Sequence, residues 1–166
     1  MKHVLFITDT LRPRREVFEH TVHMCAEMTS RLQVLQVINP KRCRQLLSST
    51  QTRLERMQNM MEAHMCAATY AQAGAFDLAR ECLRHGQEGL AELQPLAERT
   101  GIGMHWTQRV GAPVHEISAF LDERPNIVMA VFDAVDIHSQ RGAKNSLRKL
   151  RKTISYQMGI PLTIPI

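Results

Sequence analysis

The fold is decided by the stretch PNIVMAVFD, which spans residues 125–133. Ile127 to Phe132 form a continuous apolar run that is rich in β-branched residues. Such a run is typical of a parallel strand covered on both faces, because a half-exposed strand alternates apolar and polar residues. The run ends on Asp133. The sequence therefore predicts a buried strand with an acidic side chain at its carboxyl end, where open α/β sheets bind ligands.

Four further segments of the chain have strand character. They are residues 4–7, 32–38, 102–109 and 160–166. In the last of these, Pro165 cannot donate a hydrogen bond, which favours the edge of a sheet. Helical spacing of apolar residues begins at Pro13 and again over 114–123. Strands that alternate with helices predict a parallel, doubly wound α/β sheet.

The region 41–100 has the pattern of a helical hairpin. Apolar residues recur at a spacing of three and four on both sides of residues 73–75, whose sequence Ala-Gly-Ala predicts a turn. Pro95 should kink or restart the second helix. The two narrow apolar seams are consistent with an intramolecular core and equally with a dimer contact.

Length and composition favour one intracellular domain. The chain has 166 residues, of which 44% are hydrophobic, enough for one well-buried core. No apolar run approaches the roughly 18 residues that span a bilayer, so we expect a cytoplasmic protein without a membrane partner. The four cysteines show no Cys-x-x-Cys spacing and are expected to be reduced and packed, with no metal site. His20 and His23, one helical turn apart, are interpreted as part of a solvated helix face.

The net charge of +5 comes from one segment. Residues 137–166 hold six lysines and arginines and no acid, and no aromatic side chain between 138 and 155 could stack on a base. We interpret this segment as the solvated face of the last helix. Binding of nucleic acid through Arg148, Lys149, Arg151 and Lys152 is the alternative.

The order of these motifs resembles the universal stress protein family. The resemblance is carried by a first strand that ends in Asp9, by VINP at 37–40, by GAP at 111–113 before a helix, by IVM at 127–129 and by IPLTI at 160–164. It covers residues 1–40 and 95–166. The implied fold is flavodoxin-like, of the adenine nucleotide alpha hydrolase-like type: five mainly parallel strands in the order 3-2-1-4-5 with helices on both faces. Residues 1–166 then form a single domain, and 41–100 are a helical insertion within it.

The resemblance also implies where a nucleotide would bind. In nucleotide-binding members, an Asp after the first strand and a Val in the second contact the adenosine, and Asp9 and Val37 match them. The glycine motif that holds the phosphates falls on Ala130, Asp133, Ala143 and Lys144, none of which matches. Glycines let backbone N–H groups approach a phosphate closely, whereas Asp133 adds a Cβ and a negative charge. ATP binding through this motif is therefore not expected.

Basic side chains offer a different way to hold an anion at the same rim of the sheet. Arg12, Arg14, Arg15, Arg141 and Lys144 all follow strands at this end. A nucleotide or another anion held by these side chains is one alternative, since guanidinium groups suit phosphate and carboxylate. The other is that they are surface residues that pair with Asp9, Asp133 and Asp136.

The resemblance implies a regulatory or protein-interaction module of the stress response, which we expect to be non-catalytic. No nucleophile–base pair is evident, so weak nucleotide hydrolysis is the one enzymatic exception. No cofactor is expected beyond the nucleotide or anion alternative. We expect a homodimer, formed through the last strand or the helical seams, and a protein partner that the sequence does not identify.

Overall fold

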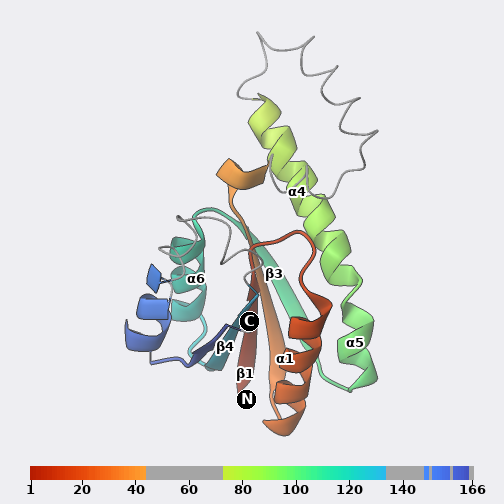
Figure 1. Ribbon diagram of the computed structural model, residues 1–166, viewed down its shortest axis with the longest axis vertical. Helices are drawn as coiled ribbons and strands as arrows, with labels where there is room; N and C mark the ends of the chain where they lie inside the picture. Colours follow the sequence, from red (N-terminus) through yellow and green to blue (C-terminus); the bar gives the residue numbers. More distant parts are fainter. Residues whose placement is uncertain (44–72, 134–147, 150, 158, 165–166) are drawn as a thin grey trace.

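The computed structural model describes residues 1–43, 73–133, 148–149, 151–157 and 159–164. These residues contain one sheet of five strands, all parallel: β1 (His3–Thr8), β2 (Arg31–Ile38), β3 (Met104–Val110), β4 (Ile127–Asp133) and β5 (Leu162–Thr163). Their order is β3-β2-β1-β4-β5, as predicted (Figure 1). The predicted terminal strand is shortened to two residues at the edge next to β4.

Helices cover both faces of this sheet (Figure 1). One layer contains α1 (Arg15–Glu27), α4 (Ala73–Ala91) and α5 (Gln94–Arg99), and the other contains α6 (Pro113–Asp122) and the π-helix η2 (Lys152–Gln157). A short 3₁₀ helix, η1 (Pro40–Arg42), follows β2. The fold class predicted from the sequence is confirmed.

Successive residues of the central strand fill two separate cores. Val4 and Phe6 of β1 face α1 and α4, and the Phe6 ring meets Phe18 edge to face with 5.4 Å between ring centroids. Leu5 and Ile7 face α6 and η2. All four of these β1 residues are fully buried. Burial on both faces explains why the strand sequences are continuously apolar.

The helical region agrees with the sequence prediction in part. Pro95 lies in the first turn of α5, which starts anew after α4 ends at Ala91, as predicted. The predicted turn at 73–75 is wrong, because α4 begins at Ala73 and these residues are helical. One glycine costs a helix only about 1 kcal/mol, so Gly74 is tolerated in the first turn of α4. The first helix of the predicted hairpin lies outside the described residues.

Two glycines let α4 approach the sheet and its loops closely. A Cβ on Gly89 would lie 2.1 Å from the carbonyl oxygen of Leu11, which belongs to the loop after β1. A Cβ on Gly86 would lie 2.4 Å from the Gln36 side chain. Cys82 of the helix packs there with Leu11, Ile38 and Cys43. The helix therefore rests on the loops at the carboxyl ends of β1 and β2.

The end of α1 holds a strained residue. Ser30 donates its N–H to Cys25 and Thr29 to Ala26, which is the Schellman arrangement, and Thr29 takes the left-handed position with φ of 48°. The same motif ends α5, but there Gly101 holds that position with φ of 70°. A β-branched residue is disfavoured in this conformation.

We expect Thr29→Gly to stabilise the protein by about 1 kcal/mol, because glycine adopts positive φ without steric cost. Urea unfolding measures the change. The reciprocal substitution Gly101→Thr in the matching motif of α5 should destabilise by a similar amount, since a Cβ there meets no atom within 4 Å and only backbone strain is added. A loss of stability in Thr29→Gly would contradict the assignment of Thr29 as a strained residue at positive φ.

The cysteines behave as packed thiols where they are described. Cys25, Cys43 and Cys82 are free and buried, as predicted, and Cys66 lies outside the described residues. Burial raises the pKa of Cys25 to about 11 and that of Cys82 to about 12. No helix in the described part of the chain is long and apolar enough to cross a membrane.

Candidate functional site

The candidate site lies at the carboxyl ends of the two central strands. β1 and β4 are neighbours, and their register places Thr8 opposite Asp133. Asp9 follows Thr8 directly, so both acidic residues singled out from the sequence come to the same end of the sheet. The loop between them and α1 is braced by a hydrogen bond between the Thr8 and Thr10 hydroxyl groups, 3.0 Å apart.

Asp133 is held by the residue that precedes α1. Its side chain is 0% exposed, and the Arg14 guanidinium donates from Nε to Oδ1 at 2.7 Å. The backbone N–H of Arg14 donates to Oδ2 at 2.8 Å. The carboxylate therefore accepts one charge-assisted hydrogen bond from the guanidinium and one from a backbone amide. Both donors lie at the start of α1, where a bound anion would be stabilised by the free backbone N–H groups and the helix dipole. The negative charge of Asp133, which the sequence places at the phosphate position, is paired with Arg14 within the protein.

Asp9 is held by a different arginine. Arg42 of η1 donates from Nη1 to Oδ2 of Asp9 at 3.0 Å. The Nε atom of Arg42 is buried without a hydrogen-bond partner. Burial raises the pKa of Asp9, an effect that Arg42 opposes without cancelling. A carboxyl group with a perturbed pKa at a strand end is a candidate binding residue.

The two family positions in the strands are both buried. Val37 is 0% exposed and packs in the core on the α6 side of the sheet. Ala130 is also 0% exposed and lies inside β4, paired with Leu5 of β1. Its N–H donates to Pro161 at 2.9 Å. The strand continues past it to Asp133, so the first two positions of the phosphate motif are strand residues whose backbone is used in the sheet.

A buried amide network fixes the wall of the site beside α4. Gln36, which is fully buried in β2, donates to the carbonyl of Thr10 at 2.7 Å and accepts from Gln108 of β3 at the same distance. Gln108 also donates to the Leu83 carbonyl of α4 at 3.0 Å. These bonds tie the loop after β1 to two strands and to a helix. Such a fully satisfied network rigidifies the loop that carries Asp9.

The structure separates the basic residues that the sequence grouped at this rim. Arg14 pairs with Asp133, Arg15 pairs with Glu19 of its own helix at 2.8 Å, and Arg12 is exposed. The pairing of Arg14 with Asp133 is the surface-pairing alternative considered above. Arg141, Lys144, Ala143 and Asp136 lie outside the described residues.

Arg42 is the site residue that the sequence reasoning missed. Arg42 lies between the VINP segment and the helical region. Its side chain reaches Asp9 only because of the direction that η1 gives to the chain, and no sequence motif indicates that direction. His20 and His23 are exposed on α1, as predicted. Among the described residues, no three His, Cys, Asp or Glu side chains gather as a metal ion would require.

Solved structures of universal stress proteins share this architecture. UspA from Lactobacillus plantarum has a TM-score of 0.67 at 11% identity, covering 99% of this chain and 97% of that one. The universal stress protein from Archaeoglobus fulgidus in complex with dAMP has a TM-score of 0.57 at 11% identity, covering 99% and 97%. A universal stress protein in complex with cAMP has a TM-score of 0.53 at 12% identity, covering 99% and 95%.

No protein-family model and no curated protein matches the sequence. The likeness to the solved structures, over nearly the full length of both chains, therefore carries the assignment. It agrees with the resemblance that the sequence motifs indicated. This chain has the fold of the universal stress proteins.

Proposed function

We propose that this chain is a non-catalytic regulatory or protein-interaction domain of the universal stress protein type whose nucleotide site is closed by its own side chains. The observation that carries the proposal is the pair of internal ion pairs, Arg42 with Asp9 and Arg14 with Asp133. Each carboxylate at the carboxyl ends of β1 and β4 already has a cationic partner. An incoming nucleotide would have to displace both.

The backbone at the phosphate position supports the same proposal. A phosphate loop needs consecutive N–H groups that turn toward the ligand. Here β4 runs through Ala130 to Asp133, and the pairing of Asp133 with Thr8 keeps this backbone in the sheet. Two structures of this fold were solved with dAMP and cAMP, so the fold itself accommodates adenine nucleotides. The closure is proposed as a property of this chain's own residues.

Isothermal titration with Mg-ATP and with dAMP tests the proposal. We expect no binding tighter than about 1 mM to the unmodified protein, equivalent to about −4 kcal/mol. Arg42→Ala should improve dAMP affinity, because it frees the carboxylate that the fold's nucleoside position requires. Arg15→Ala, which removes an exposed arginine paired within α1, is the matched control and should change nothing. Micromolar ATP affinity of the unmodified protein would refute the proposal.

The regulatory role implies a macromolecular partner, and we propose a second copy of the chain as one of them. β5 is a two-residue edge strand, and Ile160, Leu162 and Ile164 beside it are only partly buried against the core. This edge fits the homodimer expected from the sequence. Light scattering in the presence and absence of Mg-ATP reports the assembly state and its response to ligand.

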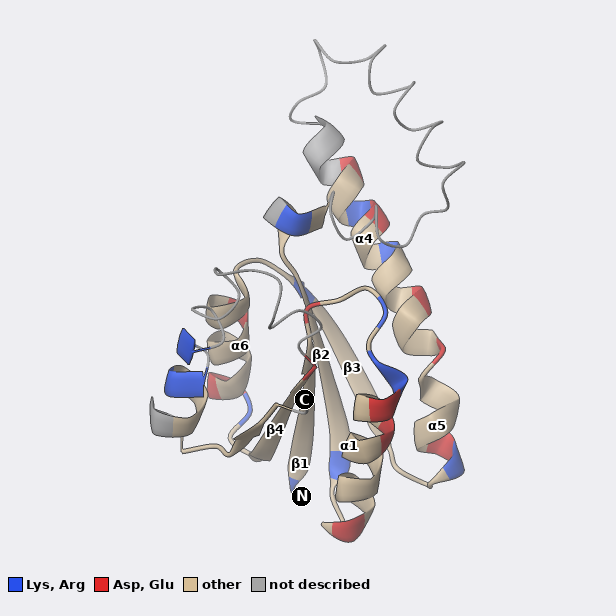
Figure 2. Cartoon of the chain, in the orientation of Figure 1, with Lys and Arg blue, Asp and Glu red and all other residues tan. Residues whose placement is uncertain are grey.

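The basic segment supports a second candidate, binding of nucleic acid. Arg148, Lys149, Arg151 and Lys152 are all exposed, and η2, which begins at Lys152, lies against α6; basic residues are drawn in blue in Figure 2. If they contact phosphates, the affinity for a 20-nucleotide duplex should fall steeply with salt, with a slope of about −0.9 per phosphate contact. Fluorescence anisotropy measures it. Neutralising all four residues with glutamine should abolish binding, and salt-independent or absent binding excludes this candidate.

A further inference from the structure

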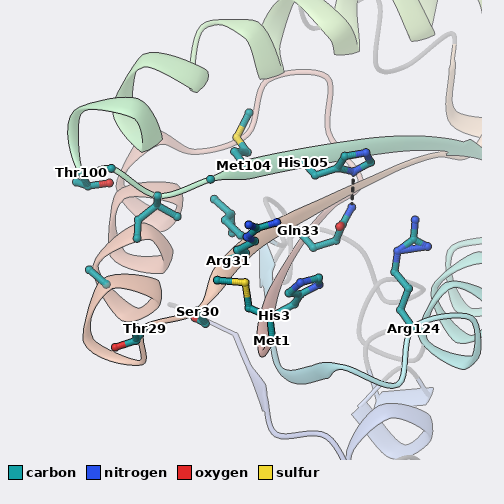
Figure 3. Close-up of a pocket in the computed structure, with 15 residues that line it drawn as sticks. Met1, His3, Thr29, Ser30, Arg31, Gln33, Thr100, Met104, His105 and Arg124 are labelled. Carbon is teal, nitrogen blue, oxygen red and sulfur yellow. Dashed lines mark hydrogen bonds between the residues drawn. The ribbon is translucent and has the colours of Figure 1, made fainter.

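A groove at the opposite end of the sheet from Asp9 and Asp133 has the character of an anion site. It has a volume of about 950 Å³ and is formed by the amino ends of β1, β2 and β3 with the residues that follow α1 and α5 (Figure 3). Ligand sites commonly have volumes of about 300–1,000 Å³. Four lining side chains are basic or can become so: His3, Arg31, His105 and Arg124. No Asp or Glu is among the described residues that line it.

The positive side chains surround one opening. Figure 3 shows Arg31 and Arg124 on two sides of it, with His3 and His105 between them and Gln33 bonded to His105 at 3.1 Å. The pKa of His3 is lowered by burial first, and then by the amino terminus, Arg31 and Arg124. Since those cations act on the same imidazole, their positive potentials overlap at His3. An anion at that place would be attracted by the amino terminus, Arg31 and Arg124 together.

Both arginines have donors left for a ligand. In the described part of the chain no carboxylate lies within 4 Å of the Arg31 guanidinium, and Arg31 is exposed. Arg124 stacks on the Phe120 ring at 4.3 Å, which fixes the plane of its guanidinium. Its carboxylate neighbour Glu123 is 3.8 Å away and is bonded at 2.5 Å to Arg109 instead.

The groove also offers apolar surface and a rigid frame. Met1 and Ile102 contribute apolar side chains to the lining, and Gly103 leaves the rim open because a Cβ there would meet no atom within 4 Å. The backbone is held by sheet hydrogen bonds, from Arg31 to Lys2 and from Leu32 to Gly103, both 3.1 Å. A site on strand ends of this kind keeps its geometry when a ligand binds.

We infer that this groove binds a small organic phosphate monoester, with the phosphate between Arg31, His3 and Arg124 and the apolar body on Met1 and Ile102. Guanidinium groups donate paired hydrogen bonds to phosphate oxygens. The apolar side chains favour an ester over inorganic phosphate, because the ester buries its organic part. The site is separate from the nucleotide site and does not depend on whether that site is closed.

Titration with phenyl phosphate, followed by calorimetry and by NMR of the histidine rings, tests the inference. We expect a Kd below about 1 mM, weaker binding of inorganic phosphate, and shifts of the His3 and His105 resonances but not of His20 and His23, which are exposed on α1. Arg31→Gln with Arg124→Gln should weaken binding at least about tenfold. Arg31→Lys with Arg124→Lys keeps the charge but loses the paired hydrogen bonds, so it should weaken binding by less than the glutamine variant does.

The matched control removes two arginines elsewhere. Arg80→Gln with Arg84→Gln lowers the net charge by the same amount at exposed positions of α4 and should leave the affinity within about twofold. The inference is overturned if this control loses as much affinity as the groove variant, if the groove variant keeps its affinity, or if His20 and His23 shift instead. It is also overturned if phenyl phosphate does not bind at about 10 mM. The ring shifts in the unmodified protein decide the matter even if the groove variant folds poorly.

Discussion

Replacing Gly89 with alanine is expected to destabilise the protein by about 2–3 kcal/mol, the upper range for overpacking a filled interior. The added Cβ would lie 2.1 Å from the Leu11 carbonyl oxygen and 3.2 Å from its carbon. These are backbone atoms, so no side chain can swing aside to make room. Helix propensity alone predicts the opposite, because alanine favours a helix by about 1 kcal/mol over glycine. The sign of the change therefore separates packing from propensity.

The measurement is urea unfolding, with Gly103→Ala as the control. Gly103 has open space within 4 Å and lies outside α4, so the same change there should stay within about 0.5 kcal/mol. A stabilised Gly89→Ala variant would mean that α4 does not contact the loop after β1. The loop carries Thr10, so we also expect the substitution to disturb the hydrogen bond from Gln36.

Asp133→Ala is the second substitution with a large expected effect. It removes the acceptor of two hydrogen bonds, from the guanidinium and from the backbone N–H of Arg14, in a place where the carboxylate is fully buried. Breaking a fully buried pair costs about 3–5 kcal/mol. Because the Arg14 side chain is 36% exposed, water compensates in part, and we expect about 2 kcal/mol.

Glu19→Ala is the matched control for this variant. Glu19 accepts from Arg15 at 2.8 Å, a distance close to that of the Arg14 pair, but both side chains are well exposed. Its removal should cost no more than about 0.5 kcal/mol by the same urea measurement. Equal losses from the two substitutions would show that burial of Asp133 adds nothing to the strength of its ion pair.

The sheet could be predicted from the sequence because a strand that is buried on both faces is apolar at successive positions. Val4 to Ile7 and Ile127 to Phe132 are apolar at every position, and the structure covers them from both sides. Pro95 likewise acts through its own missing N–H, so its effect on the helix could be read locally. The order of the strands followed from the family resemblance and not from these runs.

The ion pairs of the site could be predicted only in part. The sequence named Asp9, Asp133 and Arg14 and considered that they might pair, but it gave no reason to choose Arg42 as the partner of Asp9. The pairing of Arg42 with Asp9 depends on the direction that the short 3₁₀ helix η1 gives to the chain. That direction produces no periodic pattern in the sequence. Gly86 and Gly89 were a usable signal, because two glycines three residues apart inside a helical pattern indicate close packing.

The sheet order also governs when this chain can fold during synthesis. β1 leaves the ribosome first, yet one of its two neighbours is β4, and the Arg14–Asp133 bonds join residues 119 positions apart. At about 5–20 residues per second, the open edge of this strand, with four consecutive apolar residues, waits about 6 to 24 seconds for its partner. Until then it is a template for pairing with other chains. The exposure of a nascent molecule to misassembly is thus set by the late place of β4 in the sequence, whatever the stability of the finished domain.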